Sequence, residues 1–249
     1  MNSTLARKIV GLVILAFVFV PGTLIAAETT LFQIGRADDN TAEFALGPNR
    51  SGQYSAAFPR DAIYVVGQSD PKRDWPYIHP GPADVWAGSK SHTATILFGV
   101  ESAPTQGTCT LHMDLVDTHS SVPPRLQIKV NGTLFEKQLP RGAGDASAFG
   151  EVEKGRECRT SIEFPARLIE KGTNTITVAN TRGSWFLYDC VRLTAPDSVT
   201  LGALTEVNEL LDVHTQPFLV RDAGKLCQPV FASVLHIGEP VEALSLIHI

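Results

Sequence analysis

The sequence predicts an all-β fold, an antiparallel β-sandwich. Three observations point to this class. Apolar and polar residues alternate with a period of two in several segments, turns rich in Gly and Pro separate these segments, and helix signals are scarce. After residue 28 the pattern is strand, turn and strand almost throughout.

The N-terminus has the features of a secretory signal peptide over residues 1–27. Arg7 and Lys8 precede an apolar run of about 12 residues, and small residues, Ala26 and Ala27, follow it. A membrane span needs roughly 20 residues, so an uncleaved anchor is the less favoured alternative. We expect cleavage after Ala27, no membrane association after cleavage, and a secreted or periplasmic mature protein.

The clearest predicted strand is at residues 109–116, and further strand candidates precede it. These candidates are residues 31–35, 43–46, 62–66 and 93–100. In the strand 109–116, Leu111 and Met113 share the apolar face with Cys109, whereas His112 and Asp114 lie on the opposite face. The polar pair is a candidate binding site on a sheet face, and a solvated face is the favoured alternative.

A hairpin and two further strands complete the predicted sandwich. Residues 125–130 alternate, Asn131-Gly132 is typical of a two-residue turn, and residues 133–139 form the returning strand. Residues 165–172 are the best helix candidate, because Pro165 is suited to a helix start and Gly172 to its end. Strands are predicted again at residues 174–180 and 186–193.

The predicted sandwich, residues 28–197, is followed by a different composition. Pro, Asp, Ser and Gly break the pattern, so residues 198–211 are predicted as a linker. Strand-like sequence resumes over residues 212–243, but two strands do not make a stable domain, and a truncated second β domain is predicted there. Residues 244–249 resemble translated sequencing-adapter read-through and are interpreted as a sequencing artefact.

Charge and cysteine content limit the partners. Cleavage of the signal peptide would remove two positive charges and move the formal net charge from −5 to −7. No nucleic acid partner is expected, because phosphate contacts need clustered Lys and Arg. An exported protein can pair its four cysteines in three ways, and none of the four has the close spacing of a zinc site. These cysteines are Cys109, Cys158, Cys190 and Cys227.

Six stretches occur in an order that resembles a known family. They are residues 33–44 (QIGRADDNTAEF), 64–67 (YVVG), 74–75 (DW), 130–132 (VNG), 171–176 (KGTNTI) and 187–189 (LYD). This series resembles the carbohydrate-binding-module-like C-terminal domain, domain III, of family 4 polysaccharide lyases, the rhamnogalacturonan lyases. The resemblance implies a galactose-binding-like jelly roll over most of the first domain. It leaves the lyase catalytic domain without a counterpart, so no catalytic residue is carried over.

The segment 73–88 is the best candidate for a binding site. Its aromatic side chains lie in a proline-stiffened stretch without strand or helix periodicity, and aromatic rings can stack on the C–H faces of sugars. Carboxylate and imidazole groups there can bind sugar hydroxyls. The alternative is that the rings only cover one end of the sandwich. The predicted carbohydrate-binding residues are Asp74, Trp75, Tyr77, His79, Asp84, Trp86 and Trp185.

Other features predict little chemistry of their own. Arg141, Arg156 and Arg159 are candidate contacts for an acidic sugar, although exposed arginines are common. Asp189 lies in an apolar strand and is expected to have a structural partner. No hydrolase, metalloprotease, phosphate-loop or dinucleotide motif is found, so no catalytic residue is assigned. No cofactor is expected, although a structural calcium ion is compatible with a jelly roll.

The sequence therefore predicts a non-catalytic carbohydrate-binding-like module of an exported polysaccharide-degrading enzyme. The parent protein would be a polysaccharide lyase or glycoside hydrolase, and a downstream catalytic domain of the same chain would be its partner. A polysaccharide or oligosaccharide, in particular a pectic one, is the expected ligand. The alternative is a structural spacer at the front of a large secreted glycosidase, with no sugar binding of its own.

Overall fold

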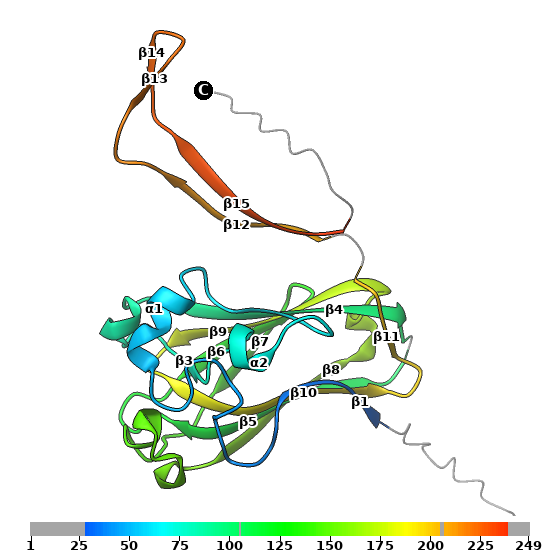
Figure 1. The fold of residues 1–249 in the computed structure, drawn as a ribbon. Coiled ribbons are helices and arrows are strands. Elements are labelled where there is room, and N and C mark those ends of the chain that lie inside the picture. Colours follow the sequence, from blue (N-terminus) through cyan, green and yellow to red (C-terminus); the bar gives the residue numbers. More distant parts are fainter. Residues whose placement is uncertain (1–27, 105, 205–206, 239–249) are drawn as a thin grey trace, which may run out of the picture.

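The computed structural model describes residues 28–104, 106–204 and 207–238. The predicted signal peptide, residues 1–27, and the predicted artefact, residues 244–249, lie outside the described residues. The described chain contains a jelly-roll sandwich of two sheets and a separate hairpin arm (Figure 1). This confirms the predicted fold class.

The first sheet has the strand order β1-β10-β5-β8, with β3 pairing the start of β10, and every pair in it is antiparallel. Its strands are β1 (Glu28–Gly35), β3 (Ile78–His79), β5 (Thr108–Thr118), β8 (Cys158–Pro165) and β10 (Phe186–Pro196). The alternation in β5 places Leu111 and Met113 in the core and His112 and Asp114 on the outer face.

The second sheet has the order β11-β4-β9-β6-β7, and β2 pairs with β4 in parallel. Its strands are β2 (Ile63–Val65), β4 (His92–Ser102), β6 (Arg125–Val130), β7 (Thr133–Gln138), β9 (Gly172–Arg182) and β11 (Thr200–Gly202). The β6–β7 hairpin is as predicted. Asn131 and Gly132 both have positive φ, 44° and 85°, which this tight turn requires.

The helices are short and lie in loops. They are η1 (Ser51–Gln53), α1 (Tyr54–Ala57), α2 (Pro71–Asp74), η2 (Val85–Ala87), η3 (Ser147–Phe149), η4 (Val152–Lys154) and η5 (Ala166–Leu168). The helix predicted at residues 165–172 is only η5, because Pro165 still belongs to β8 and Gly172 already begins β9. The predicted strand 43–46 is instead a pair of turns, closed by backbone hydrogen bonds from Phe44 to Thr41 and from Gly47 to Phe44.

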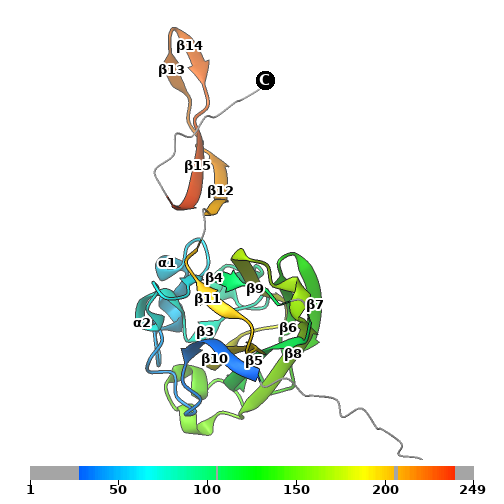
Figure 2. The same ribbon diagram turned by 90° about the vertical axis from the view of Figure 1, so that its right-hand side faces the viewer.

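The core lies between the two sheets, which are stacked one above the other in two perpendicular views (Figures 1 and 2). Strand residues fill most of it, but loop residues complete it. Trp75, Tyr77 and Tyr54 come from the loops and are among the largest fully buried side chains.

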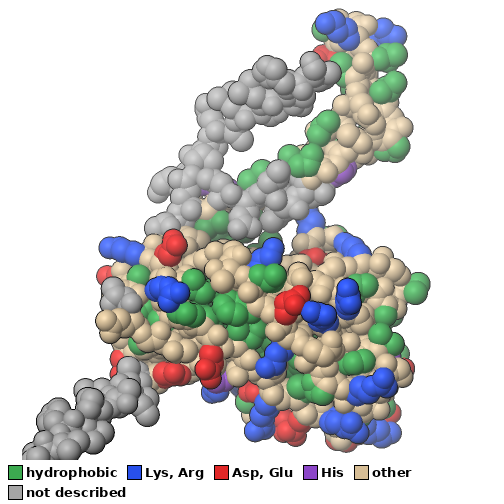
Figure 3. Space-filling view, turned by 180° about the vertical axis from the view of Figure 1, so that it is seen from behind, with side chains coloured by type: hydrophobic (Ala, Val, Ile, Leu, Met, Phe, Trp, Pro, Cys, Tyr) green, Lys and Arg blue, Asp and Glu red, His purple; other side chains and the backbone are tan. Residues whose placement is uncertain are grey.

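The hairpin arm follows the sandwich. It consists of β12 (Val207–Thr215) with β15 (Val230–Ile237), and of β13 (Val220–Asp222) with β14 (Lys225–Cys227) at its tip. At its base Val207 packs with Val65 and Leu97. The arm carries exposed hydrophobic side chains (Figure 3). They include Val213, Phe218, Leu219, Leu226, Phe231 and Val234.

The segment predicted as a linker, residues 198–211, contains two strands. A turn closed by a hydrogen bond from Val199 N–H to the Pro196 carbonyl reverses the chain, and β11 then pairs with β4. The arm begins at Val207, before the predicted residue 212. The reason lies in β4. One edge of β4 pairs with β9, and β2 covers only residues 95–97 of the other edge. A short polar segment can pair with the rest of that edge, because the pairing uses backbone hydrogen bonds and not side chains.

The four cysteines are free thiols, three of them buried and Cys227 exposed. Burial raises the pKa of Cys109 to about 11 and that of Cys190 to about 12, so both remain uncharged at neutral pH. Cys109 packs in the core as predicted. Within residues 28–104, 106–204 and 207–238, no helix is long and apolar enough to cross a membrane.

Candidate functional site

One end of the sandwich contains a pocket of about 300 Å³, here called the loop-end pocket. It lies where the 78–88 segment, the end of β5 and the start of β10 meet the 140–150 loop. Its aromatic lining consists of Trp86, Phe149 and Trp185. Its polar lining consists of Ser51, Asp84, His119, Asp145 and Ser184. The pocket therefore combines exposed ring surface with hydrogen-bonding groups.

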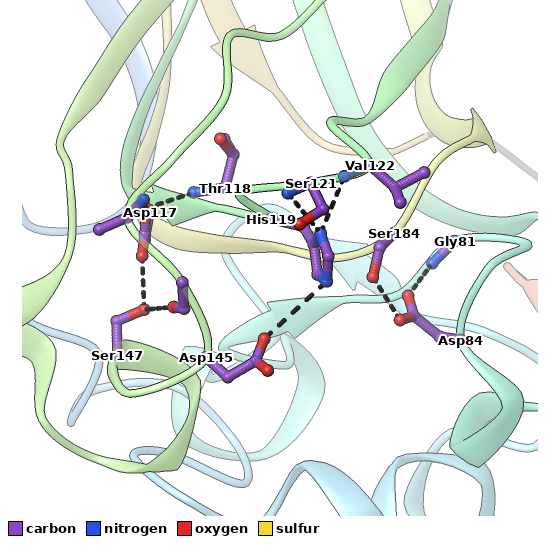
Figure 4. A network of polar contacts seen from close by, with 12 residues as sticks. Gly81, Asp84, Asp117, Thr118, His119, Ser121, Val122, Asp145, Ser147 and Ser184 are labelled. Atoms are coloured by element: carbon purple, nitrogen blue, oxygen red, sulfur yellow. Dashed lines mark hydrogen bonds and ion pairs between the residues drawn. The ribbon is translucent and has the colours of Figure 1, made fainter.

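Asp84 is fixed at the base of this pocket. Its carboxylate accepts a hydrogen bond from the Gly81 N–H at 2.7 Å and one from the Ser184 hydroxyl at 2.5 Å (Figure 4). Burial raises the pKa of Asp84, although these hydrogen bonds and one from Trp86 oppose the shift. Gly81 permits the approach, because a Cβ there would lie 2.6 Å from the Gly183 carbonyl oxygen. Asp84 is thus a pre-positioned acceptor.

His119 presents a donor to the same pocket. Its Nδ1 lies 3.2 Å from the Ser121 amide nitrogen and 3.0 Å from that of Val122 (Figure 4). Because backbone amides can only donate, Nδ1 is an acceptor and the ring proton of the neutral form resides on Nε2. Nε2 lies 3.9 Å from an Asp145 oxygen, and the ring meets Trp185 edge-on at 5.6 Å.

Asp117 holds the 140–150 loop that carries Asp145 and Phe149. One carboxylate oxygen accepts hydrogen bonds from the Thr118 and Ala143 amides, both at 2.9 Å, and the other accepts one from the Ser147 hydroxyl at 2.6 Å (Figure 4). Asp117 is fully buried, so these three hydrogen bonds offset the cost of removing its charge from water. The loop is therefore fastened to the end of β5.

Gly142 allows this close fit, and its replacement gives a first prediction. A Cβ at residue 142 would lie 1.8 Å from the Thr118 carbonyl oxygen and 2.2 Å from an Asp117 oxygen. We expect Gly142→Ala to reduce the free energy of unfolding by about 1–3 kcal/mol, as overpacking does. It should also shift the amide resonances of Ala143 and Ser147.

Urea unfolding and amide NMR spectra measure these effects. Gly52→Ala is the matched control, because no atom lies within 4 Å of a Cβ at residue 52. Equal stability losses for the two variants would contradict the role assigned to Gly142.

Three of the seven predicted site residues, Asp84, Trp86 and Trp185, line the loop-end pocket. Trp86 is 36% exposed and meets Tyr54 edge-on, so part of its ring is free. Trp185 is only 4% exposed and supports the wall behind His119.

Trp75, Tyr77 and His79 lie in the core instead. Trp75 has no exposed surface and packs against Tyr64 and Tyr188. Tyr77 is equally buried, and its hydroxyl donates a hydrogen bond to the Ala148 carbonyl at 2.8 Å. A sugar cannot stack on a ring without exposed surface, so direct contact by Trp75 and Tyr77 does not fit this structure. Tyr77 instead positions η3 beside the pocket.

His79 and Asp74 also have structural partners. The Nε2 of His79 donates to the His92 carbonyl at 2.9 Å, and Nδ1 accepts from the Tyr188 hydroxyl at 2.8 Å. Burial lowers the pKa of His79 to about 4. Asp74 forms an ion pair with Arg73 at 2.7 Å and is not part of the loop-end pocket. Direct contact of His79 with a sugar is excluded by its burial.

Sequence reasoning missed several of the pocket residues, among them His119, Asp145 and Phe149. His119 lies just beyond the predicted strand 109–116, and strand ends commonly carry binding residues. Asp145 lies four residues after Arg141, and the sequence predicted a ligand contact only for Arg141 in this region. Phe149 is 65% exposed. In the sequence, the signal that points to it is a lone aromatic residue in the Gly- and Ala-rich stretch 142–150.

An acidic cluster lies elsewhere on the sandwich. Oxygens of Asp38, Glu43 and Asp189 lie within 4.8 Å of one another, which makes the cluster the place where carboxylates could hold a structural calcium ion. Asp189 accepts backbone hydrogen bonds from Asp38 and Asn40. Burial raises its pKa to about 6, and the nearby Asp39 and Asp38 add to the shift. Asp189 thus has the structural partners that the sequence predicted.

An antiparallel jelly roll with an aromatic and polar pocket among its end loops defines a carbohydrate-binding-like β-sandwich module. The chain belongs to the family described as CBM-like, polysaccharide lyase family 4, domain III, whose sequence profile matches residues 30–193. This confirms the resemblance drawn from the six ordered stretches.

The chain is also similar to individual proteins of known name. The chain is 26% identical over 173 residues to a rhamnogalacturonate lyase of Dickeya dadantii, which corresponds to 65% of this chain and 27% of the lyase. It is also similar to a family 35 carbohydrate binding module from an environmental isolate, at 20% identity and a TM-score of 0.30, covering 47% of this chain and 72% of that one. The same kind of module from Cellvibrio japonicus Abf62 has 13% identity and a TM-score of 0.31, covering 46% and 71%. The chain spans about a quarter of the lyase.

Proposed function

We propose that this chain is the non-catalytic, carbohydrate-binding part of an exported polysaccharide-degrading enzyme of the rhamnogalacturonan lyase type. The family membership and the relative, of which the chain covers 27%, support this proposal. The catalytic domain would lie elsewhere in the parent protein. Residues 1–27 would direct export, and the mature protein would be secreted or periplasmic.

The loop-end pocket is the observation that carries the proposal. Its volume of about 300 Å³ is at the lower end of the range for ligand sites. The exposed parts of Trp86 and Phe149 offer ring surface to the C–H face of a sugar. Asp84 accepts and His119 donates, which matches the two hydrogen-bonding roles of a sugar hydroxyl.

The hairpin arm fits a second β domain. A two-stranded hairpin is at best marginally stable in water, and this one exposes large apolar side chains on its surface. We infer that these side chains pack against further strands of the parent protein. The base of the arm, where Val207 is 6% exposed, would be the junction between the two domains.

The ring of Trp86 gives the second prediction. Trp86→Ala is expected to weaken binding of an oligosaccharide ligand at least tenfold, because truncating an aromatic anchor typically costs about 2 kcal/mol. Phe149→Ala should weaken binding in the same direction. Isothermal titration calorimetry with pectic and neutral oligosaccharides measures both effects.

The control for this experiment is Phe218→Ala, which removes a ring of similar exposure from the hairpin arm. It should leave the affinity within about twofold of the unmodified protein. Saturable binding that is insensitive to Trp86→Ala and to Phe149→Ala would place the sugar elsewhere and refute the pocket.

The second candidate function is a structural spacer. The burial of Trp75 and Tyr77 favours it, because the aromatic-rich segment then serves mainly to close the sandwich. In that case no pectic or neutral oligosaccharide would bind at millimolar concentration. Trp86→Ala would then change only the unfolding transition.

A further inference from the structure

The outer face of the first sheet carries a groove of about 610 Å³, here called the basic groove. Its floor comes from three neighbouring strands, β10, β5 and β8. In their register Arg192 of β10 lies opposite His112 of β5, and His112 lies opposite Ser161 of β8. Two register positions further along, and therefore on the same face, Asp114 lies opposite Arg159. Residues distant in sequence are thus fixed side by side on a rigid sheet.

The rim of the groove adds another cation. Lys137 projects from β7, an edge strand of the second sheet, and its Nζ donates to the Ser161 carbonyl at 3.3 Å. This contact holds the ammonium group over β8. The basic groove and the loop-end pocket have no lining residue in common.

The charges in the groove are unbalanced. Lys137, Arg159 and Arg192 face one carboxylate, Asp114, although the chain as a whole has a formal charge of −5. Among the described residues, Lys137 and Arg192 form no ion pair. Arg159 has only an open contact of 3.6 Å with Glu157, in which both side chains are mostly exposed. Exposed contacts of this kind neutralise little charge.

One polar atom of a groove residue lacks a partner in the protein. Nε of Arg192 is buried and forms no hydrogen bond in the part of the chain that the structure describes. Buried polar atoms without partners are rare in folded proteins and call for an explanation. A ligand oxygen in the groove is an explanation that also accounts for the excess of cations.

We propose that the basic groove binds a carboxylate-bearing sugar unit, a hexuronate, of an acidic polysaccharide. The planar guanidinium of Arg192 matches a carboxylate, and Arg159 and Lys137 add charge around it. His112, Asp114 and the hydroxyl of Ser161 are suited to the sugar hydroxyls. The inference rests on the proposed carbohydrate-binding function and adds a second site with a defined charge class.

The same cations would accept another oxyanion, a sulfate ester, so the experiment has to separate the two. The full chain is titrated with a galacturonate oligomer, a sulfated galactan oligomer and a neutral galactan oligomer of equal length. We expect the galacturonate oligomer to bind more tightly than the other two. Its affinity should fall as salt is raised, because the groove is open to solvent and its charges are screened.

Two groove variants and one control test the residues. Arg192→Gln should weaken galacturonate binding about tenfold or more, the cost of a lost hydrogen bond to a charged group, and leave neutral binding unchanged. Arg159→Gln changes an exposed side chain and tests the same groove with little risk to folding. Lys129→Gln is the control, because it removes an exposed cation from β6 in the other sheet.

Each outcome has a defined meaning. Equal losses for Arg192→Gln and Lys129→Gln would mean that only net charge matters, and the groove would be refuted. If the sulfated oligomer binds more tightly than the galacturonate oligomer, and this binding depends on Arg192, the proposal that the groove selects a carboxylate would be refuted. If Trp86→Ala abolishes neutral binding while Arg192→Gln has no effect, the proposed function stands and this inference fails. If Arg192→Gln weakens galacturonate binding while Trp86→Ala has no effect, the basic groove is supported and only the loop-end pocket is refuted as a sugar site. Absence of binding by all three oligomers refutes both sites.

Discussion

Trp75→Ala is expected to lower the free energy of unfolding by about 3–5 kcal/mol, the range for removing a large ring from a core. The ring has no exposed surface and packs against Tyr64 and Tyr188, so its loss leaves a cavity that the two sheets cannot close. The affinity of the remaining folded protein for an oligosaccharide should stay within about twofold. Urea unfolding and calorimetric titration below the unfolding transition measure the two quantities.

Trp75→Phe is the matched variant. The indole N–H of Trp75 has no hydrogen-bond partner in the described part of the chain, and phenylalanine removes this unsatisfied donor while it keeps an aromatic ring. We expect Trp75→Phe to lower the free energy of unfolding by less than half as much as Trp75→Ala does. A loss of sugar binding in Trp75→Phe, with stability preserved, would return the residue to the binding site and contradict its assignment to the core.

The second large expected effect is a loss of folding stability at acidic pH, caused by His79. His79 titrates near 6.5 when unfolded, whereas burial lowers its pKa to about 4 in the folded protein. Between these values the unfolded chain takes up a proton that the folded chain does not. The contribution of His79 to stability is therefore present above pH 6.5 and lost as pH falls to 4, by about 3 kcal/mol in total.

Asp189 acts in the opposite direction. Its pKa is raised to about 6, so the folded protein binds a proton between pH 6 and 3.8 that the unfolded chain does not bind, and this stabilises the fold as pH falls. In the unmodified protein, the effects of His79 and Asp189 on the pH dependence of stability therefore partly cancel. Asp189→Asn should reveal the full acid loss of His79, and His79→Gln should abolish it.

Urea unfolding at several pH values between 4 and 7 measures these slopes. His79→Gln retains a donor for the His92 carbonyl and an acceptor for the Tyr188 hydroxyl, so the variant should fold. Identical pH dependence in His79→Gln and the unmodified protein would contradict the assignment of the acid loss to this residue.

The sequence predicted those features of the fold that depend on a local pattern of residues. The period of two in β5 assigned Leu111 to the core and His112 to the outer face, and Asn131-Gly132 placed the β6–β7 turn. Both follow from the geometry of the strand itself. The short edge strand β11 has no pattern of its own, because it exists only where β4 offers a free edge.

The candidate site was only partly predictable for a related reason. The 73–88 segment has no period, so its sequence does not reveal which of its rings lie inside. Tertiary contacts decide this. Trp75 is buried by Tyr188, and the Tyr77 hydroxyl finds its acceptor in Ala148, both of which lie far along the chain. The pocket wall formed by His119 and Phe149 likewise depends on how the 140–150 loop docks onto β5.

The loop-end pocket has a wall that is secured from two sides, by the Asp117 carboxylate and by the Tyr77 hydroxyl. Both anchors form when the chain folds, so the conformational entropy of this wall is lost at that moment and not when a ligand arrives. A rigid, preorganised wall spares the ligand this cost. Association should then require little rearrangement of the backbone, and its heat-capacity change should follow from the apolar area that the ligand covers.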